Sequence, residues 1–577
     1  MQYIWIKNNI MIITVCLLLI AIISSIVLFE INNYKKKNKK ILDNIRYDWE
    51  HPYHLDTDDI TLQDLYKSYI CLSNKSNNEI DDITWNDLEM DGIYKTLNYT
   101  KSSLGENFLY KMLREPLYNI ALLKEREQII NLFYTNDNLR NKQLTQLTRI
   151  GKRNRLSIWE FKNDISKFTF YSLLPHRLYP IFMLITILII PINMVWGVIL
   201  SLIMLSVNVF SYYSTKEKIE HYIPLLIEIG SMLASIKGLS EKTGYEIIDK
   251  YTCKLAAGAK LNKKFNKYIL KIRTMIFGYT TDIDTLVDYI RIVTHMDLIA
   301  FVKLINYVNK NMELIQECYE IVGYIDSMLS LTIFKRQHSL IYKDKFSLCV
   351  PELSDKNKAI LFAKDIYNPL LKDAVKNTVD ITKSMLITGS NATGKSTFLR
   401  TIGVNAILAQ TIYMVYGQEY KGSLFKIFTS MKIEDNIYEA NSTYMMEIKS
   451  IKRILDATAD DNITILCCMD EVLRGTNTIE RIGAASEILK SLSFNNVLCL
   501  AATHDIELSY ILEEYYNNYH FQEQVTQDNI LFDYKLYNGR SYTRNAIQLL
   551  KLIGYSDNIV SKAVKKVDDY LATGKWV

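Results

Sequence analysis

The strongest chemical signal in this sequence is a nine-residue segment with two glycines, one lysine and four hydroxyl side chains. It consists of Gly389, Ser390, Asn391, Ala392, Thr393, Gly394, Lys395, Ser396 and Thr397. Glycines let backbone N–H groups close on phosphate oxygens, the lysine can reach the β and γ phosphates, and the next hydroxyl can bind Mg²⁺. The segment therefore predicts a phosphate-binding loop (P-loop) for a nucleoside triphosphate, with Lys395 at the phosphates and Ser396 at the metal.

Two adjacent carboxylates, Asp470 and Glu471, follow the apolar residues 463–469. A carboxylate at a strand end beside a P-loop can hold Mg²⁺ through water or Ser396, and its neighbour can orient or deprotonate the attacking water. By itself, the apolar run is also compatible with an ordinary buried strand. Its occurrence after the loop favours a hydrolytic site, with Asp470 at the metal and Glu471 at the water.

A third candidate, His504, follows the apolar residues 496–502 and Thr503. In a doubly wound sheet, ligands bind at the carboxyl ends of the strands, where this imidazole would lie. A lone histidine is more often a packing or surface residue. Its place after a third strand nevertheless favours a role in sensing the γ-phosphate or positioning water.

The elements that must position these residues are strands and helices in alternation. We expect strands at 384–388, 463–469 and 496–502 and a helix at 398–410. Upstream, from residue 222 to about 336, apolar residues recur every three or four positions, which indicates long packed helices. We therefore expect an α/β domain over 341–577, preceded by a helical core or lever domain over 85–340 and by a basic linker and polar stretch at 35–84.

The composition excludes several classes of protein. Hydrophobic residues make up 49% and charged residues 23%, with 20 Gly and 8 Pro, so the 577-residue chain is not disordered, collagen-like or of low complexity. The formal net charge of +5 gives no argument by itself for a nucleic-acid partner. The eight cysteines show neither zinc-ligand nor disulfide spacing, so we expect most of the chain in a reducing compartment.

Residues 10–29 contain no charged side chain, and this length matches a hydrocarbon core of ~30 Å. Five lysines follow at 35–40, whereas a signal peptide would carry its basic residues ahead of the apolar run. Because positive residues stay in the cytoplasm, we expect residues 1–34 to be a transmembrane anchor whose N-terminus points outward.

A second uncharged run at 181–210 is too long for one span and too short for two full ones. Pro191 and Asn193 interrupt it, and both flanks are basic. We expect a tight or re-entrant membrane hairpin at 178–212; the alternative is a buried helical hairpin of a soluble core. An even number of crossings keeps the nucleotide site inside, so the predicted location is the cell membrane with the α/β domain in the cytoplasm.

Four motifs resemble those of the MutS family of ATPases in order and spacing. They are the loop at 387–400, the Ser-Thr-Phe-Met-x-Glu element at 441–447, the Asp-Glu and Arg-Gly-Thr-x-Thr segment at 470–478, and the Ala-Thr-His strand end at 502–504. Residues 97–117 are similar to the opening of the family's helical core domain. The resemblance implies an ABC-type P-loop ATPase domain at the C-terminus, with ATP and Mg²⁺ as cofactors. It also implies a homodimer in which Ser442 of one subunit approaches the nucleotide at Lys395 of the other.

The chain also departs from the family pattern. Residues 1–84 contain no counterpart of the Phe-x-Glu wedge, so we expect no mismatch reading by that device. Tyr438, Glu439, Ala440 and Asn441 stand where the family usually has Ser-Arg-Gly-x, which replaces a basic residue by an acidic one. Ala374 and Val375 fall where the family has an adenine-stacking aromatic residue, which leaves base selectivity open.

A basic stretch in the expected helical domain is relevant to the kind of partner that the protein binds. Its members are Lys254, Lys260, Lys263, Lys264, Lys267, Lys271 and Arg273. Seven phosphate contacts would give salt-dependent binding of DNA without sequence preference. A helix face on anionic lipid, or one simply in solvent, are the alternatives.

The sequence thus predicts a membrane-anchored, MutS-like ATP hydrolase that acts as a clamp on DNA, in mismatch repair or recombination. The alternative is an ATP-switched membrane clamp or scaffold whose partner is lipid or protein. An ABC transporter subunit is a third reading, which we set aside because no Leu-Ser-Gly-Gly-Gln signature follows the loop and the apolar segments are too few to line a pathway.

Overall fold

The computed structural model describes most of the chain. Described are residues 2–53, 59–72, 78–152, 158–162, 173–273, 289–356, 358–390, 393–431, 443–459, 464–474, 476–494, 496–525, 530–540, 547, 550 and 553–573. The chain forms two compact units. The helical unit comprises Met1–His54, Tyr99–Glu106 and Asn131–Leu340; the sheet unit comprises Leu55–Asn98, Asn107–Ile130 and Ile341–Val577.

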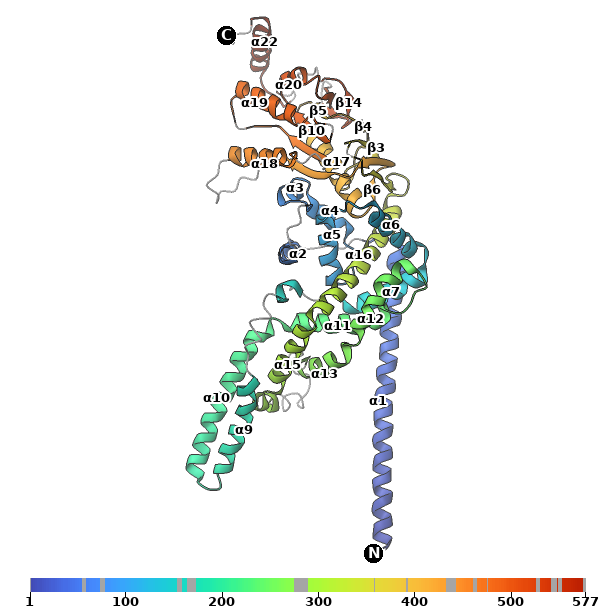
Figure 1. The fold of residues 1–577 in the computed structure, drawn as a ribbon, viewed down its shortest axis with the longest axis vertical. Helices are drawn as coiled ribbons and strands as arrows, with labels where there is room; N and C mark the ends of the chain where they lie inside the picture. Colours follow the sequence, from blue (N-terminus) through green and yellow to red (C-terminus); the bar gives the residue numbers. More distant parts are fainter. Residues whose placement is uncertain are drawn as a thin grey trace. The chain divides into compact units, whose positions relative to one another are not determined.

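The helical unit consists of long helices (Figure 1). They are α1 (Gln2–Glu50), α7 (Asp137–Ile150), α9 (Leu173–Ile189), α10 (Met194–Glu220), α11 (Ile223–Leu239), α12 (Glu246–Ala259), α13 (Asn262–Arg273), α15 (Met296–Lys310) and α16 (Met312–Tyr342). The apolar helix α11 packs against α7, α12 and α13, and α13 packs against α15. Gly230 permits this packing, because a Cβ atom there would lie 2.9 Å from the Phe265 ring. The expected three-and-four spacing therefore corresponds to a buried helical core.

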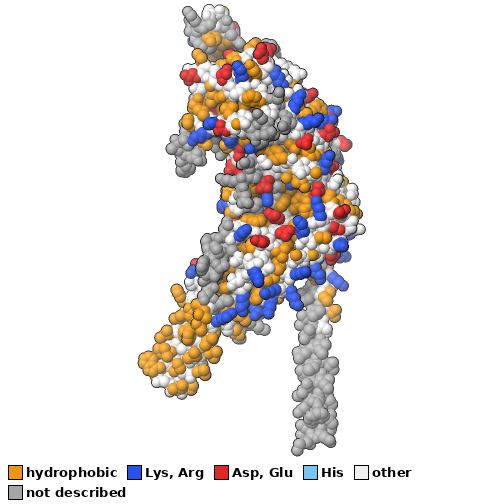
Figure 2. All heavy atoms as spheres, viewed as in Figure 1, with side chains coloured by type: hydrophobic (Ala, Val, Ile, Leu, Met, Phe, Trp, Pro, Cys, Tyr) orange, Lys and Arg blue, Asp and Glu red, His pale blue; other side chains and the backbone are white. Residues whose placement is uncertain are grey.

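Helices α9 and α10 form the apolar hairpin (Figures 1 and 2). The chain turns between them, and the side chain of Asn193 caps α10 by accepting a hydrogen bond from the Trp196 N–H at 3.3 Å. Gly197 lets the helices approach closely, since a Cβ atom there would lie 2.6 Å from the Ile190 backbone. The broken middle of the run is thus a helical hairpin, as the sequence predicts.

The hairpin presents its apolar side chains outward. Ile192 is 85% exposed and Phe210 is 78% exposed, and the space-filling view shows hydrophobic side chains over most of the visible surface of the hairpin (Figure 2). Among the described residues, α10 is the one helix long and apolar enough to cross a membrane, with 11% of its apolar window buried, and the shorter apolar helix is Leu174–Ile189. A hairpin buried in a soluble core does not fit this exposure. The backbone of the expected anchor lies in α1, but the side chains of residues 2–20 lie outside the description.

The sheet unit is built on six strands in the order β14-β11-β5-β10-β9-β8. Their bounds are β5 (Met385–Thr388), β8 (Lys426–Ser430), β9 (Ile465–Asp470), β10 (Val497–Thr503), β11 (Asn517–His520) and β14 (Tyr537–Asn538). Neighbouring strands from β11 to β8 are parallel, and β14 is antiparallel to β11. Strands β9 and β10 are buried along their whole length, which explains why their sequences are continuous apolar runs rather than alternating ones.

Helices cover both faces of this sheet. Helix α17 (Lys395–Thr411) packs against β8, β9 and β10. Helices α18 (Thr443–Ala457), α19 (Thr478–Ser491) and α20 (Ile506–Ile511) share a buried core with alternate residues of β9 and β10. Since alternate side chains of a strand point to opposite faces, α17 covers the other face. The strands and helix expected at 384–388, 463–469, 496–502 and 398–410 are therefore observed as β5, β9, β10 and α17.

Smaller elements complete the sheet unit. A second sheet has the order β2-β7-β3-β4, with β2 (Glu352–Ser354), β3 (Leu361–Ile366), β4 (Asn377–Ile381) and β7 (Glu419–Ser423). Two further pairs are β1 (Leu348–Cys349) with β6 (Val415–Tyr416), and β12 (Glu523–Val525) with β13 (Ile530–Phe532). The remaining helices are α2 (Asp59–Leu72), α3 (Asp82–Asp87), α4 (Met90–Leu97), α5 (Ser103–Arg114), α6 (Ile120–Thr135) and α22 (Asp557–Thr573).

The units are interleaved in sequence, whereas the expected domains are continuous ranges. The early segments belong to the sheet unit because α3 binds the edge strand β8. Asp87 at the end of α3 accepts hydrogen bonds from the Thr429 hydroxyl at 2.7 Å and the Met431 N–H at 2.9 Å. Asp87 is buried, and burying a carboxylate without hydrogen-bond partners costs free energy. The two hydrogen bonds offset this cost.

Candidate nucleotide-binding site

The glycine-containing loop at 389–394 joins the end of β5 to the start of α17. Gly389 has φ 146° and Gly394 has φ 104°, conformations that other residues rarely adopt. A Cβ atom on Gly389 would also lie 2.7 Å from the Phe521 carbonyl oxygen. The two glycines therefore permit the tight turn that leads into α17, whose N-terminus is the kind of site that binds an anion. Asn391 and Ala392 lie outside the described residues.

Lys395 is the first residue of α17 and is buried. Its ammonium donates hydrogen bonds to the carbonyl oxygens of Gly389 at 2.7 Å and Ser390 at 2.8 Å. Burial lowers the pKa of Lys395 to about 8, partly offset by Asp470 and Glu471. The Lys395 ammonium thus lies where it could pair with the negative charge of a bound phosphate.

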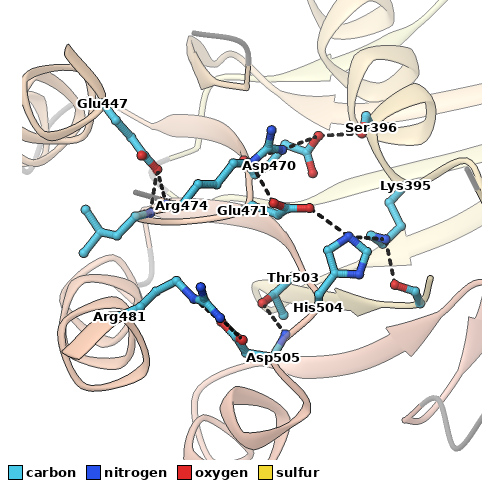
Figure 3. A network of polar contacts seen from close by, with 12 residues as sticks. Lys395, Ser396, Glu447, Asp470, Glu471, Arg474, Arg481, Thr503, His504 and Asp505 are labelled. Carbon is cyan, nitrogen blue, oxygen red and sulfur yellow. Dashed lines mark hydrogen bonds and ion pairs between the residues drawn. The ribbon is translucent and has the colours of Figure 1, made fainter. Parts of the chain in front are cut away.

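Ser396 and Asp470 meet beside this lysine (Figure 3). The Ser396 hydroxyl donates a hydrogen bond to Oδ2 of Asp470, which ends β9 and is 8% exposed. A hydroxyl and a carboxylate are the hard oxygen ligands that Mg²⁺ prefers, with the remaining positions left to water and phosphate oxygens. The described residues contain no cluster of three or more His, Cys, Asp or Glu side chains for a metal. Ser396 and Asp470 therefore fit a metal ion that also binds a nucleotide, rather than one held by protein side chains alone.

Glu471 occupies a turn directly after β9, with φ 55°. Its N–H donates to the Ala502 carbonyl oxygen at 2.9 Å, which ties the turn to β10. One carboxylate oxygen lies 2.8 Å from His504 Nε2, and the other lies 2.7 Å from Arg474 Nε (Figure 3). The hydrogen bond from His504 is the largest cause that lowers the pKa of Glu471, with Arg474 and Lys395 adding to it.

The strand register explains why these side chains meet. Ala502 pairs with Asp470, and Thr503 pairs with Thr388, so the ends of β5, β9 and β10 lie at one edge. His504 follows β10 at this edge, 3.3 Å from the Lys395 ammonium. The structure thus brings together the predicted Lys395, Ser396, Asp470, Glu471 and His504.

Further charged residues lie around the site (Figure 3). The carboxylate of Glu447, in α18, accepts hydrogen bonds from the N–H groups of Leu473 and Arg474. Arg481 forms a two-bond ion pair with Asp505, at 2.9 and 2.7 Å. Glu447 closes the Ser-Thr-Phe-Met-x-Glu element and Arg474 opens the Arg-Gly-Thr-x-Thr segment, so both lie in motifs of the sequence, whereas Arg481 lies in none of them.

A cavity of about 750 Å³ within the sheet unit opens at this edge. It is lined by Ser390, Thr393, Gly394, Lys395, Ser396, Thr397, Asp470, Glu471 and His504, together with Ala374, Val375, Phe521 and Tyr534. Phe521 and Tyr534 come from the C-terminal segment, which the sequence did not indicate, and Phe398 of α17 also lines the cavity. Ser390 donates to the Glu523 carboxylate at 2.6 Å, so that segment also contacts the loop. The predicted Ser442, and residues 438–441, lie outside the described residues.

Comparisons with known proteins agree with this arrangement. Residues 385–570 match the family described as MutS domain V. The DNA mismatch repair protein MutS of Fervidobacterium nodosum is 24% identical over 515 residues, which cover 82% of this chain and 60% of that protein. MutS protein homolog 4 of Mus musculus is 27% identical over 355 residues, covering 56% of this chain and 35% of that protein. The chain therefore spans less than two thirds of these relatives.

These matches support a place in the MutS family at low identity. They agree with a MutS domain V at the C-terminus and a mostly helical region before it. The name of the Fervidobacterium nodosum relative identifies that protein as a DNA mismatch repair protein. Residues 385–570 contain the predicted site residues from Gly389 to His504, so family match and geometry concern the same segment.

Proposed function

We propose that the sheet unit binds ATP with Mg²⁺ and hydrolyses it. The observation that carries this proposal is the convergence of Lys395, the Ser396–Asp470 pair and the Glu471–His504 pair at one sheet edge. The cavity at that edge has about 750 Å³, within the range of pockets that hold small-molecule ligands. The match to MutS domain V supports the same assignment.

Each residue has a distinct role in this proposal. Lys395 and the N–H groups of the loop bind the β and γ phosphates and offset charge that develops on them. Glu471, kept ionised by His504 and Arg474, accepts a proton from the attacking water or orients it. His504 holds Glu471 in place and contacts the lysine, so it lies where it can respond to the γ-phosphate.

Ser396 and Asp470 would hold Mg²⁺. When bound, the ion supplies Lewis-acid stabilisation of phosphate oxygens. The Ser396–Asp470 hydrogen bond already places the two protein ligands side by side.

We further propose that the protein is a membrane-anchored, homodimeric clamp that binds DNA without base-specific reading, in mismatch repair or a related process. The name of the Fervidobacterium nodosum relative, a DNA mismatch repair protein, supports the DNA partner. The exposed apolar hairpin supports attachment to the cell membrane, with the sheet unit in the cytoplasm where ATP is found. The same hairpin favours a second candidate, an ATP-switched membrane clamp or scaffold that acts on lipid or protein.

The hydrolytic role is tested by Glu471→Gln in the detergent-solubilised full chain. We expect this variant to bind MgATP with wild-type affinity while phosphate release falls about 10²- to 10⁴-fold, the usual size of a general-base contribution. Glu487→Gln, an exposed change on α19, is the matched control and should keep wild-type turnover. Turnover of Glu471→Gln within twofold of wild type would remove Glu471 from the chemistry.

A further inference from the structure

The sequence around α13 is strongly basic. Residues 250–281 contain no acidic residue and eight basic ones: Lys250, Lys254, Lys260, Lys263, Lys264, Lys267, Lys271 and Arg273. Positive charge here is therefore not balanced by acidic neighbours along the chain. A locally uniform charge of this kind attracts an anionic surface or polymer.

Helix α13 separates its charged and apolar residues into two faces. The exposed arc carries Lys263, Lys264, Lys267 and Lys271, which we call the lysine face. Phe265, Ile269 and Ile272 are buried on the opposite side of α13, which packs against α11 and α15. The helix is thus anchored by its apolar side, and its lysine face is directed outward.

An exposed leucine lies at the edge of the lysine face. Leu270 is 61% exposed, one position before Lys271 and three after Lys267. DNA phosphates offer nothing apolar for such a side chain to contact. A large apolar side chain beside lysines can instead enter the interface between lipid headgroups and acyl chains.

The lysine face lies in the same unit as the apolar hairpin and close to it. Helix α13 packs against α15, and α15 packs against both α9 and α10. The Lys264 ammonium lies 5.0 Å from the ring centre of Tyr307 in α15, which ties the face to this helix. In Figure 2, lysine and arginine side chains gather over this region, beside the hydrophobic surface of the hairpin.

The hairpin itself indicates where a bilayer surface would lie. Its outer part is apolar on all visible sides, and Phe210 and Tyr213, near its base, are 78% and 52% exposed. Aromatic residues favour the membrane–water interface. A bilayer that contains the hairpin therefore ends near its base, at the end of the unit from which α15 leads to α13.

We propose that the lysine face of α13 binds the surface of a bilayer rich in anionic phospholipids, with Leu270 entering the interface. This inference rests on the proposed membrane attachment of the hairpin. Once the hairpin is inserted, the lysines are held close to the headgroups, where attraction to anionic lipid is strong and falls within a Debye length. The lysine face then fixes the orientation of the helical unit on the membrane, and DNA is bound elsewhere.

The test uses the full chain reconstituted into vesicles of phosphatidylcholine alone or mixed with phosphatidylglycerol. Limited acylation of lysines, read by mass spectrometry, reports which amines are covered. We expect labelling of Lys263, Lys264 and Lys267 to fall severalfold in the anionic vesicles and to recover in high salt. Lys452, 71% exposed in the sheet unit, should label equally in both.

A third arm adds duplex DNA at low salt to the phosphatidylcholine vesicles. Protection of the same lysines by DNA, without protection by anionic lipid, would overturn the proposal and assign the face to nucleic acid. Unchanged labelling in all arms would overturn it in favour of a solvated face. Extraction of the chain from vesicles by alkaline carbonate would instead contradict the membrane attachment itself, so the two failures are distinguishable.

A charge-matched pair of variants checks the assignment. Lys263→Gln/Lys264→Gln/Lys267→Gln should stay in the vesicles and keep ATP hydrolysis, but protection of Lys271 by anionic lipid should be lost. Lys562→Gln/Lys565→Gln/Lys566→Gln removes the same charge from exposed positions of α22 and should keep that protection. Equal protection of Lys271 in both variants would overturn the proposal.

Discussion

At the scale of residues, the site depends on how the Glu471 carboxylate is held. His504 and Arg474 each bind one of its oxygens, at 2.8 and 2.7 Å. They lower the pKa of Glu471, with His504 contributing most. Because only the ionised carboxylate can accept a proton from water, these contacts keep Glu471 in the form that a general base needs.

We expect His504→Gln to change the pH dependence of hydrolysis as well as its rate. Without the hydrogen bond from His504, the pKa of Glu471 rises toward its ordinary value, so the acid limb of the pH–rate profile moves to higher pH. Turnover should fall about 10-fold or more, whereas the affinity for MgATP should change little. Phosphate release measured across pH checks both effects.

The control for this prediction is His520→Gln, which alters a half-buried histidine at the far side of β5 on β11. A His504→Gln profile with an unmoved acid limb would contradict the assigned contact between His504 and Glu471.

The principal site residues could be predicted because each begins or ends an element. Glycine, lysine and hydroxyl residues open a helix, and acidic residues or histidine close buried strands. Other site residues were not predicted because they reach the site across space from turns and distant strands, where spacing gives no signal. These are Phe521, Glu523 and Tyr534.

At the scale of elements, the turn after β9 is the most constrained part of the site. Glu471 and Leu473 both have positive φ, 55° and 63°, which is unfavourable for residues other than glycine. The Glu447 carboxylate in α18 binds the Leu473 and Arg474 N–H groups and so holds this turn. Helix α18 thus helps to set the position of the Glu471 carboxylate.

Replacing Glu447 tests this positioning role. Glu447→Ala leaves two backbone N–H groups without their acceptor, which costs about 1–3 kcal/mol of stability. We expect kcat to fall at least about 10-fold while KM for ATP stays within about twofold, because the turn moves but the phosphate loop does not. Steady-state kinetics with thermal unfolding as a check on folding provide the measurement.

Glu447→Gln is the conservative comparison. One Glu447 oxygen makes both hydrogen bonds, and the other is buried without a hydrogen-bond partner among the described residues, so an amide can replace the carboxylate. Near-wild-type kcat is expected for Glu447→Gln. Equal losses of kcat in both variants would argue against positioning by this acceptor.

The sequence predicts the types of the helices and strands better than the order of the strands in the sheet. Pro191 and Asn193 interrupt a continuous apolar run, and the structure turns there between α9 and α10. The order β5-β10-β9, in contrast, has no sequence signal. Strands buried on both faces lack the alternation that would indicate a register, so neighbours cannot be read from them.

At the scale of the whole molecule, we propose a dimer that contains two nucleotide sites and is attached to a membrane. The interleaved units were not predictable, because segments 55–98 and 107–130 join the sheet unit through contacts such as those of Asp87 with β8. The dimer is a prediction from the family resemblance, with Ser442 reaching the nucleotide of the partner subunit. Binding of ATP would then close two composite sites at once.

We expect MgATP to drive dimerisation of the full chain in detergent, most clearly in Glu471→Gln, which retains the triphosphate. Adding Ser442→Ala to that variant should weaken the dimer at least about 10-fold, or about 1.4 kcal/mol. Ser491→Ala, an exposed change on α19, is the control. Analytical ultracentrifugation provides the measurement, and a dimer of equal strength without nucleotide would contradict this account.

The central claim is that the loop around Lys395 binds a nucleoside triphosphate. Calorimetric titration of MgATP into the folded full chain tests it most directly, with Lys395→Ala and the exposed control Lys452→Ala in parallel. The account predicts saturable binding for wild type and Lys452→Ala, and an affinity at least about 100-fold weaker, or about 2.7 kcal/mol, for Lys395→Ala. Absence of binding to the folded wild-type chain, or equal affinity in Lys395→Ala, would contradict it.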